Sequence, residues 1–247
     1  MYESIKDRIL EARRVCVFTG AGISAESGIP TFRDAGGLWE NYKIEDLVTP
    51  EAFARNPVAV WRWHIWLQGL SFNAEPNAGH RALAAMDDFF PDYLLITQNI
   101  DDLHERGGTK RLVKIHGDVM EIKCLEKGHL TRVESALDQD SVTLDNLPVC
   151  PKCWGRARPN VVWFGEMLPH EALMSATSFA EKCDLLLIVG TSGVVSGGYG
   201  FTELAKFAGA YIVEVNPLPS NLTHLADASI REPAALALPK LFPGENP

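Results

Sequence analysis

Five short apolar runs, separated by stretches of helical character, are the feature that most constrains the fold of this chain. The runs cover residues 15–19, 93–97, 112–115, 184–189 and 211–215. Runs that are apolar throughout are typical of strands buried on both faces, and their alternation with helices indicates a parallel sheet covered on both sides. We therefore expect an α/β protein built on one parallel sheet.

Each apolar run is followed by glycine or by polar residues that are able to bind a ligand. The residues at these ends are Gly20, Gln98, His116, Thr191 and Asn216. The carboxyl ends of parallel strands meet at one edge of the sheet, and ligands of such sheets bind there. The sequence therefore predicts a binding site assembled from distant parts of the chain.

Size and charge exclude several classes of protein. The 247 residues suit one large domain, or one domain with a small insert. There are 23 Lys and Arg against 32 Asp and Glu, a net charge of −9, so we do not expect a nucleic-acid binder. No apolar run approaches the roughly 18 residues of a membrane span, and residues 1–14 do not resemble a signal peptide. Five cysteines, an odd number, argue against a disulfide scaffold and favour the reducing cytoplasm.

A glycine motif follows the first predicted strand. Residues 20–25 (GAGISA) fit the pattern G-x-G-x-x-[GA], in which glycines let backbone N–H groups approach a pyrophosphate at a helix N-terminus. An ordinary tight turn is the alternative interpretation. Residues 28–42 that follow are rich in glycine and proline and contain no second strand, unlike a dehydrogenase. Such a segment is typical of a lid over a bound cofactor.

Amide and carboxylate side chains are concentrated after the second predicted strand. Residues 97–104 (TQNIDDLH) provide donors and acceptors that suit a carboxamide such as nicotinamide. Asn and Asp also favour turns and helix caps, and on its own this segment fits that alternative better. His116 follows the third strand and suits a general base, although a lone histidine is more often structural. His80 and His104 are weaker candidates because both lie in helical contexts.

Residues 121–158 break the alternating pattern, since they are polar and contain three of the five cysteines. Cys150 and Cys153 form a C-x-x-C turn suited to a tetrahedral metal, and Cys124 lies upstream. The position that should complete a second C-x-x-C pair is Lys127, but His129 could supply a nitrogen ligand instead. The sequence therefore predicts a small module with a structural zinc site, or a degenerate knuckle without metal. The remaining two cysteines, at positions 16 and 183, are expected in the core.

Taken together, these motifs resemble those of the sirtuin family of NAD-dependent protein deacylases, prokaryotic type. The matching strings are GAGISAESGIPTFRDAGGLW (20–39), TPEAFARNP (49–57), EPNAGH (75–80), TQNIDDLHERGGT (97–109), IHGDV (115–119), VVWFGEMLP (161–169), GTSGVV (190–195) and EVNP (214–217). The resemblance implies a Rossmann-like large part at about 1–34, 78–118 and 159–247. It also implies a small helical part at about 35–77 and a zinc-ribbon-like module at about 119–158, with substrates bound in the cleft between the parts.

The resemblance also implies roles for the cofactor-binding residues. The NAD phosphates would be held by Gly20, Ala21, Gly22, Gly190, Thr191 and Ser192, and Asn216 would contact the adenosine ribose. The nicotinamide and its ribose would be bound by Ser24, Gln98, Asn99, Ile100 and Asp101. Phe32 and Arg33 would lie on the mobile loop over the reacting centre. His116 would be the general base, with Asn99 and Asp101 taking part in catalysis by favouring departure of nicotinamide.

The implied substrate is an acyl-lysine side chain of a protein, bound as an added strand. Its tunnel would be lined by the segment Val161 to Glu166, which includes Phe164 and Gly165, together with the loop at Gly193 and Val194. The acyl oxygen would attack C1′ of the nicotinamide ribose, His116 would remove a ribose hydroxyl proton, and the products would be free lysine, nicotinamide and O-acyl-ADP-ribose. The resemblance carries no prediction of the oligomeric state.

Two departures from the family pattern matter. Lys127 stands where a fourth cysteine is expected, which bears on the zinc site. Desuccinylating members carry a Tyr-x-x-Arg pair on a pocket helix, and the corresponding residues here are His64 and Leu67. Without the arginine, bidentate recognition of an acidic acyl group is lost. We therefore predict a preference for neutral acyl groups over succinyl. The same helix carries three tryptophans, of which we expect at least two in the core.

Three alternatives stay open at the level of sequence. The same scaffold could transfer ADP-ribose to protein or hydrolyse NAD, although a base at position 116 favours deacylation. A non-catalytic NAD-binding module is the second alternative, against which the combination of Gln98, Asn99, Asp101 and His116 argues. A Rossmann dehydrogenase is the third, and it requires a second strand near residues 40–50, where this chain has a Thr-Pro pair and a predicted helix.

Overall fold

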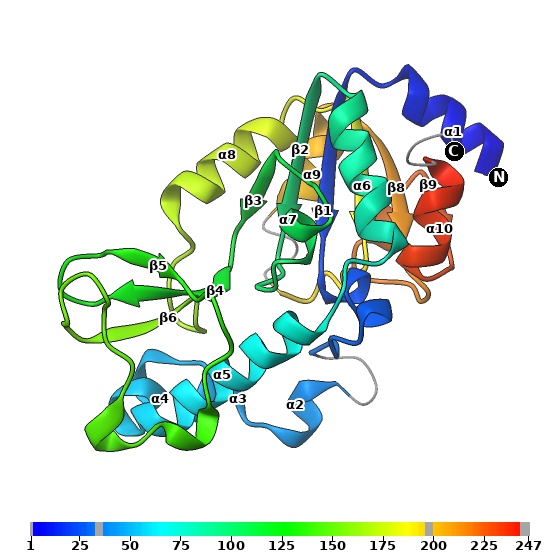
Figure 1. Ribbon diagram of the computed structural model, residues 1–247. Helices are drawn as coiled ribbons and strands as arrows, with labels where there is room; N and C mark the ends of the chain where they lie inside the picture. The colour runs from blue at the N-terminus through cyan, green and yellow to red at the C-terminus, as the bar shows by residue number, and fades with distance from the viewer. Residues whose placement is uncertain (1, 33–36, 196–199, 243–247) are drawn as a thin grey trace.

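The predicted apolar runs form five of the six strands of a parallel sheet in the computed structural model, which describes residues 2–32, 37–195 and 200–242 (Figure 1). Its strands are β1 (Arg14–Thr19), β2 (Asp92–Thr97), β3 (Leu112–Lys114), β7 (Leu185–Val189), β8 (Tyr211–Val215) and β9 (Ala228–Ile230). They lie in the order β3-β2-β1-β7-β8-β9, and every pair is parallel. The order reverses beside β1, which opens a crevice at the carboxyl ends of β1 and β7. This confirms the predicted α/β class and Rossmann-like sheet.

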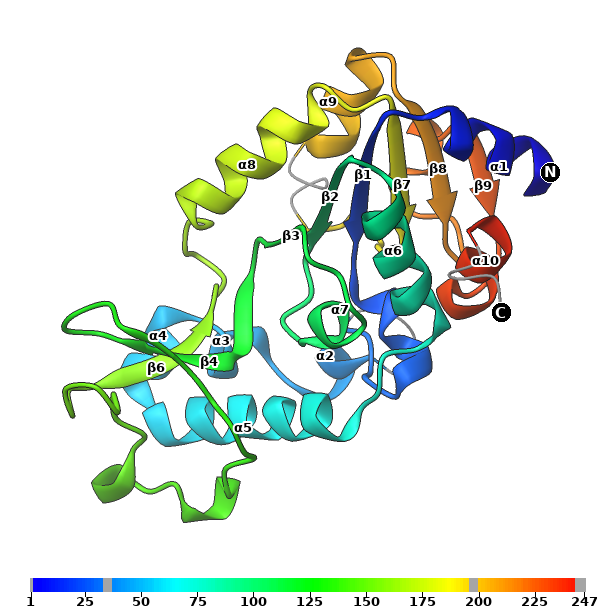
Figure 2. The ribbon, with the colours of Figure 1, turned by 45° about the horizontal axis from the view of Figure 1, so that its top comes forward.

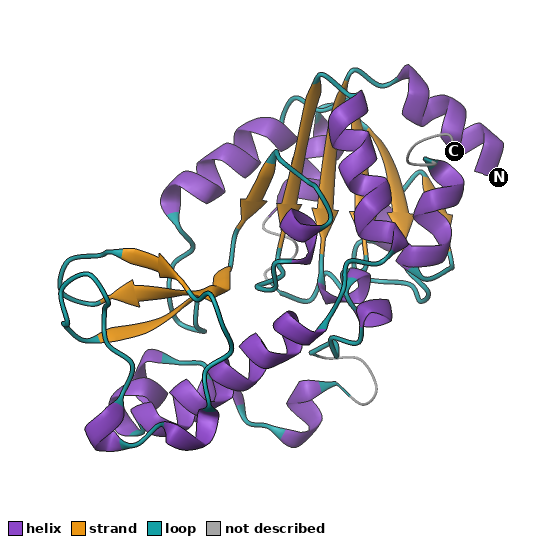
Figure 3. Cartoon of the chain, in the orientation of Figure 1, coloured by secondary structure: helices purple, strands orange, loops and turns teal. Residues whose placement is uncertain are grey.

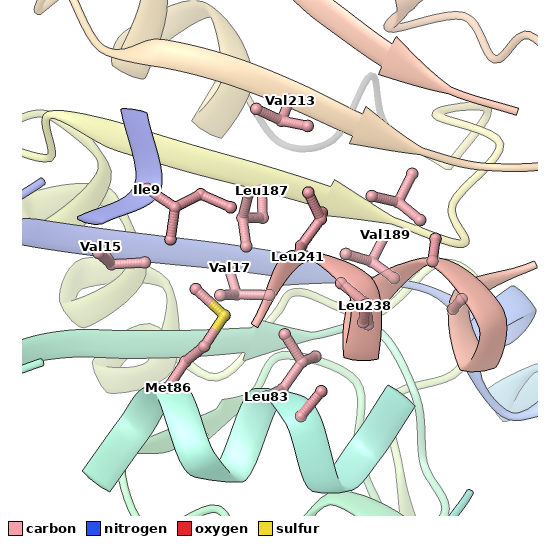
Figure 4. Close-up of a cluster of buried hydrophobic side chains, with 14 of the residues drawn as sticks. Ile9, Val15, Val17, Leu83, Met86, Leu187, Val189, Val213, Leu238 and Leu241 are labelled. Atoms are coloured by element: carbon pink, nitrogen blue, oxygen red, sulfur yellow. The ribbon is translucent and has the colours of Figure 1, made fainter. Parts of the chain in front are cut away.

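Helices cover both faces of this sheet, as Figures 1 and 3 show. One face packs against α1 (Tyr2–Glu11), α6 (Ala78–Phe89) and α10 (Ala234–Leu241), and the other against α8 (His170–Ala180) and α9 (Phe201–Phe207). Successive residues of a strand point to opposite faces, so a strand buried on both must be apolar throughout. Val17 accordingly lies among the side chains of α6 and α10 in Figure 4, whereas Phe18 packs on the opposite face.

A second sheet projects from the carboxyl edge of the first (Figure 2). It contains three antiparallel strands in the order β5-β4-β6, with bounds β4 (Gly117–Cys124), β5 (Leu130–Arg132) and β6 (Ala157–Val161). The short helix α7 (Leu103–Arg106) lies between β2 and β3 in the sequence. The predicted small inserted module is therefore present.

A helical segment lies beside the second sheet. It comprises α2 (Leu38–Asn41), α3 (Ile44–Leu47), α4 (Pro50–Arg55) and α5 (Pro57–Asn73), so the second strand required of a dehydrogenase near residues 40–50 is not there. Side chains of α5 pack on the second sheet, where Trp63 and Leu67 share a buried cluster with Val119 and Val161. Within the described ranges, no helix is both long and apolar enough to cross a membrane.

Candidate active site

The glycine motif after β1 forms a tight junction with the end of β7. Gly22 N donates to Gly190 O at 2.8 Å. Gly190 has a φ of +59°, and a Cβ added there would lie 2.5 Å from Ile23 N. A Cβ on Gly22 would lie 2.8 Å from Gly190 Cα, so no larger residue fits at either position. This close approach leaves a cradle of backbone at the crevice that suits a pyrophosphate.

A cavity of about 300 Å³ opens beside this cradle, between the large sheet and the segment that contains α5 and the end of β6. Most of the predicted site residues line it: Ala21, Gly22, Phe32, His64, Leu67, Gln98, Asn99, Ile100, His116, Val161, Phe164, Gly165, Glu166, Gly190, Thr191 and Ser192. A smaller adjoining pocket shares five of these residues and adds Ser24 and Asp101. The fold thus brings distant motifs together around one connected space.

Gln98 is oriented toward the cavity with one hydrogen-bonding group unused. Thr191 Oγ1 donates to Gln98 Oε1 at 2.8 Å, and Asn216 Nδ2 in turn donates to Thr191 O at 3.0 Å. Gln98 Nε2 is buried and has no hydrogen-bond partner among the residues that the structure describes. A buried donor without an acceptor is costly, and a hydroxyl-rich ligand in the cavity would supply one. This position therefore suits a ligand group with a hydroxyl.

Asp101 is held in a buried network below the small pocket. Its Oδ2 accepts from Ser24 Oγ at 3.1 Å and its Oδ1 from Leu103 N at 3.1 Å. Asn99 Nδ2 donates to the same Ser24 hydroxyl at 3.2 Å. Burial raises the pKa of Asp101, and the hydrogen bonds and the nearby Lys114 oppose that rise. The network presents an amide and a carboxyl group side by side, as recognition of a carboxamide requires.

The weaker histidine candidates lie behind this network. His80 Nδ1 accepts from Asn77 N at 3.3 Å, which places the ring proton on Nε2, 3.5 Å from Ser24 Oγ. His104 Nε2 lies 3.0 Å from Thr19 Oγ1. Burial lowers the pKa of His80 to about 4 and that of His104 well below its usual value. Neither histidine lines the main cavity, and both act as buried supports.

His116 lies on the cavity wall with its tautomer determined by the backbone. Its Nδ1 donates to Gln98 O at 2.8 Å, so the unprotonated lone pair is at Nε2. The ring is partly buried and lines the same cavity as Gln98 and Asn99. An imidazole whose Nδ1 proton is held by a carbonyl oxygen, at the wall of this cavity, has the orientation that a general base needs.

The far wall of the cavity contains a histidine that carries no positive charge. His64 Nδ1 donates to Val60 O at 2.8 Å, and its Nε2 accepts from Trp163 Nε1 at 3.2 Å. His64 is fully buried, and burial lowers its pKa to about 4. Arg158, which stacks 3.4 Å from the centre of the Trp163 ring, is engaged by Glu166 at 2.5 and 2.9 Å. Among the described lining residues there is no Lys or Arg.

Four side chains of the small module form a compact donor set. Ligand atoms of Cys124, His129, Cys150 and Cys153 all lie within 4.8 Å of one another. Cys124 Sγ is 3.5 Å from Cys153 Sγ, and Cys150 Sγ is 3.5 Å from His129 Nδ1. Three thiols and an imidazole at these separations fit a tetrahedral zinc ion. Lys127 contributes only its backbone N–H, which donates to Cys124 Sγ at 3.3 Å.

Comparison with known proteins agrees with this geometry. Residues 20–197 match the family model described as the Sir2 family. The chain belongs to the Sir2 family. It is 46% identical to NAD-dependent protein deacylase 2 of Pyrobaculum aerophilum over 238 residues, 96% of this chain and 93% of that protein. It is 44% identical to the NAD-dependent protein deacylase of Aquifex aeolicus over 233 residues, 94% of this chain and 95% of that one.

Solved structures of Sir2 proteins have the same fold. A Sir2 homologue in complex with ADP-ribose superposes with a TM-score of 0.91 at 41% identity, covering 98% of this chain and 95% of that chain. A complex of a Sir2 homolog with NAD gives a TM-score of 0.88 at 41% identity, covering 97% and 91%. The fold identified from the strand order is therefore the Sir2 fold.

Some residues expected from the Sir2 motifs do not line the cavity. Gly20 supports the cradle from behind, since its N–H donates to Val189 O at 3.0 Å. Asn216 reaches the site only through its bond to Thr191 O. Gly193 and Val194 lie next to the lining residue Ser192 but outside the lining, and Arg33 lies outside the described residues. Their contacts with a substrate remain predictions.

The sequence motifs did not single out several lining residues of this Sir2 cavity. Besides Thr31, Val48, Leu168 and Val195, the lining includes Trp63. Val162 and Trp163 also line the cavity, and both belong to the segment Val161 to Glu166 that was expected there. Trp63 is 5% exposed, and burial of that kind is not distinguishable from core packing in the sequence. Trp61 is fully buried away from the cavity.

Proposed function

We propose that this chain removes acyl groups from lysine side chains of proteins, consuming NAD and one water molecule and releasing free lysine, nicotinamide and O-acyl-ADP-ribose. Its place in the Sir2 family supports the coarser assignment, an NAD-dependent protein deacylase. We propose that NAD binds along the cradle at the ends of β1 and β7, and that the acyl-lysine enters between the large sheet and the small module. The free cysteines support a reducing, cytoplasmic location.

The observation that carries the proposal is the meeting of His116 with a carboxamide-type network around one cavity. Asn99 and Asp101 provide the groups that would grip the nicotinamide amide. His116 would accept the ribose hydroxyl proton at Nε2, since its Nδ1 proton is committed to Gln98 O. NAD supplies the activated ribose carbon, and the chain supplies orientation, a proton acceptor and shielding from water.

The acyl preference follows from the charge of the cavity wall. The ring nitrogens of His64 are both used inside the protein, and its pKa of about 4 keeps it neutral. Leu67 adds an apolar surface. A succinyl carboxylate would be buried there without a cation, which costs several kcal/mol or more. We therefore propose acetyl and other neutral acyl groups as substrates.

The direct experiment is mass spectrometry of products formed from NAD and an acetyl-lysine peptide. We expect O-acetyl-ADP-ribose and nicotinamide, and we expect His116→Ala to lower the rate by about 100-fold or more because it removes the proton acceptor. His170→Ala, which removes an exposed histidine of α8, is the matched control and should behave as wild type. Free ADP-ribose without the acylated product would point to NAD hydrolysis, and ADP-ribosylated protein would point to transferase activity.

The acyl preference is tested with acetyl-lysine and succinyl-lysine peptides of identical sequence. Wild-type protein should favour the acetyl peptide in kcat/KM by at least about tenfold. Leu67→Arg places a guanidinium in the cavity and should shift the ratio toward succinyl by about tenfold or more. Asn73→Arg, at an exposed position of the same helix and outside the lining, is the control and should leave the ratio unchanged. Faster turnover of succinyl peptide by wild type would contradict the proposed preference.

A further inference from the structure

Lys114, the last residue of β3, places its ammonium group between the two segments that contain the candidate catalytic residues. Its Nζ donates to Asp101 O at 2.7 Å, to Asp118 Oδ2 at 2.8 Å and to Glu105 Oε1 at 3.0 Å. An ammonium group has three hydrogens, so these contacts use all of them. The side chain is only 13% exposed.

The carbonyl group that accepts from Lys114 is the main-chain carbonyl of Asp101, which lies outside the β-sheets. Asp101 lies in the irregular connection between β2 and α7, and its carbonyl oxygen accepts the Lys114 side chain. The neighbouring backbone is tied to the β3–β4 segment at two points, Ile115 N to Thr97 O at 3.0 Å and Val119 N to Ile100 O at 2.9 Å. Lys114 is therefore the contact that fixes this connection at Asp101 itself.

The same side chain also fixes the His116 segment. Lys114 and Asp118 lie on either side of His116 in the sequence, and their ion pair encloses the turn that carries it. Asp118 Oδ1 accepts from Met120 N at 2.7 Å, which anchors the carboxylate to β4. One buried ammonium group therefore links the main chain at Asp101 to Asp118, beyond the turn that carries His116.

The charge of Lys114 is maintained in this position. Burial alone would lower its pKa, but the carboxylates of Glu105 and Asp118 raise the pKa overall, so the ammonium stays protonated. Its charge opposes the rise in the pKa of Asp101 that burial causes. Lys114 therefore acts on Asp101 in two ways, by a hydrogen bond to its carbonyl and by favouring its anionic form.

Arg132 of β5 connects this arrangement to the small module. It contacts Asp102 Oδ2 at 2.5 Å and lies 3.6 Å from Asp118 Oδ2. Asp102 is 4% exposed and also accepts from Ser71 Oγ of α5 at 3.1 Å. The connection that carries Asp101 is thus secured from the large sheet, the small sheet and α5 at once.

We propose that Lys114 is a positioning residue that sets the place of the Asp101 carboxyl group relative to His116 and thereby the affinity for the nicotinamide end of NAD. The inference rests on the proposed function, because it takes the pocket at Asp101 to receive the carboxamide. It predicts that loss of the ammonium weakens ligands that carry nicotinamide and spares those that lack it.

The test is isothermal titration calorimetry with NAD and with ADP-ribose, which lacks the nicotinamide. Lys114→Met should raise the Kd for NAD by about tenfold, which corresponds to about 1.4 kcal/mol, and leave the Kd for ADP-ribose within about twofold. Lys114→Arg retains a charged donor and should recover most of the NAD affinity. Lys206→Met is the control, since it removes a lysine whose 2.6 Å ion pair with Asp227 lies on α9, outside the cavity.

Equal weakening of NAD and ADP-ribose, or no change in either, would overturn the proposal. Thermal unfolding shows whether Lys114→Met folds, and Lys114→Gln, which retains a polar side chain, replaces it in the same titrations if it does not. The readout is binding and not turnover. A wild-type protein that binds NAD without deacylating any peptide would contradict the proposed function and leave the result for Lys114 intact.

Discussion

His64 is an ionisable residue that the folded protein keeps uncharged at neutral pH. Its Nδ1 proton is donated to Val60 O and its Nε2 lone pair accepts the Trp163 indole N–H, so an added proton would have no acceptor. Burial holds its folded-state pKa at about 4, compared with the ordinary value of 6.5. The unfolded chain therefore binds a proton more readily than the folded chain, and stability is lost as the pH falls from 6.5 toward 4.

This gives a prediction for acid sensitivity. When the pH falls from 7.5 to 5, the titration of His64 should lower the free energy of unfolding by about 2 kcal/mol. His64→Gln can still accept from Trp163 but does not titrate, so its loss of stability over this range should be smaller by that amount. The measurement is urea unfolding at both pH values, with His170→Gln as the exposed control. Identical pH dependence of wild type and His64→Gln would refute the assignment.

Two constraints require glycine at position 190, the positive φ angle and the close approach of the neighbouring backbone, and a pair of substitutions can separate them. A Cβ there meets Ile23 N and the Gly22 backbone, and its φ is +59°. Gly209 also has a positive φ, +85°, but a Cβ there meets nothing within 4 Å. Gly209→Ala should cost only the left-handed backbone strain, about 1–2 kcal/mol. Gly190→Ala should lower the free energy of unfolding by more than this and should raise the Kd for NAD at least tenfold. If both variants lose the same stability and Gly190→Ala binds NAD like wild type, the Gly22–Gly190 junction is not the cofactor-binding cradle.

Residues next to strand ends were the ones that the sequence could predict. His116 and Asp101 follow apolar runs directly, so the topology of a parallel sheet brings them to one edge. Lys114 could not be found in this way. Its role depends on a contact with a main-chain carbonyl, which no side-chain pattern encodes, and on the irregular path of residues 98–102.

At the scale of elements, long apolar strands were predictable and short polar ones were not. β7 is buried at every position and was evident as a run, whereas β9 contains only Ala228, Ser229 and Ile230 beside charged neighbours. The same holds for α2, α3 and α7, which have four residues each and depend on packing for their stability. Helix α5 was predictable because Asn56 caps it and Pro57 opens it, with the Asn56 side chain accepting from Ala59 N.

The loops after β4 and before β6 give a prediction about the metal. Purified protein should contain one zinc ion per chain by elemental analysis, bound by the Cys124, His129, Cys150 and Cys153 side chains. His129→Ala removes an imidazole ligand and should lower the zinc affinity by at least about tenfold. Lys127→Ala is the matched control, since only the backbone of Lys127 contacts the cluster. Full zinc retention by His129→Ala together with loss in Lys127→Ala would reverse the ligand assignment.

At the scale of the whole molecule, the cavity is built from segments that lie far apart in the sequence, between Ala21 and Val195. Ligand that binds this cavity should therefore stabilise the entire fold. At 100 times its Kd, NAD should add about 2.7 kcal/mol to the free energy of unfolding. The measurement is thermal or urea unfolding with and without NAD, and Gly190→Ala should show little gain. Stabilisation of that variant equal to wild type would place the NAD site elsewhere.

The junction of Gly22 with Gly190 also has a consequence for synthesis. The two glycines meet across neighbouring strands, yet most of the chain separates them in the sequence. A ribosome that has made the first motif must still produce β7 before the cradle can close. A nascent or prematurely ended chain therefore carries His116 and Asp101 without the backbone that would hold a pyrophosphate beside them. The complete cradle therefore exists only in chains that extend past residue 190.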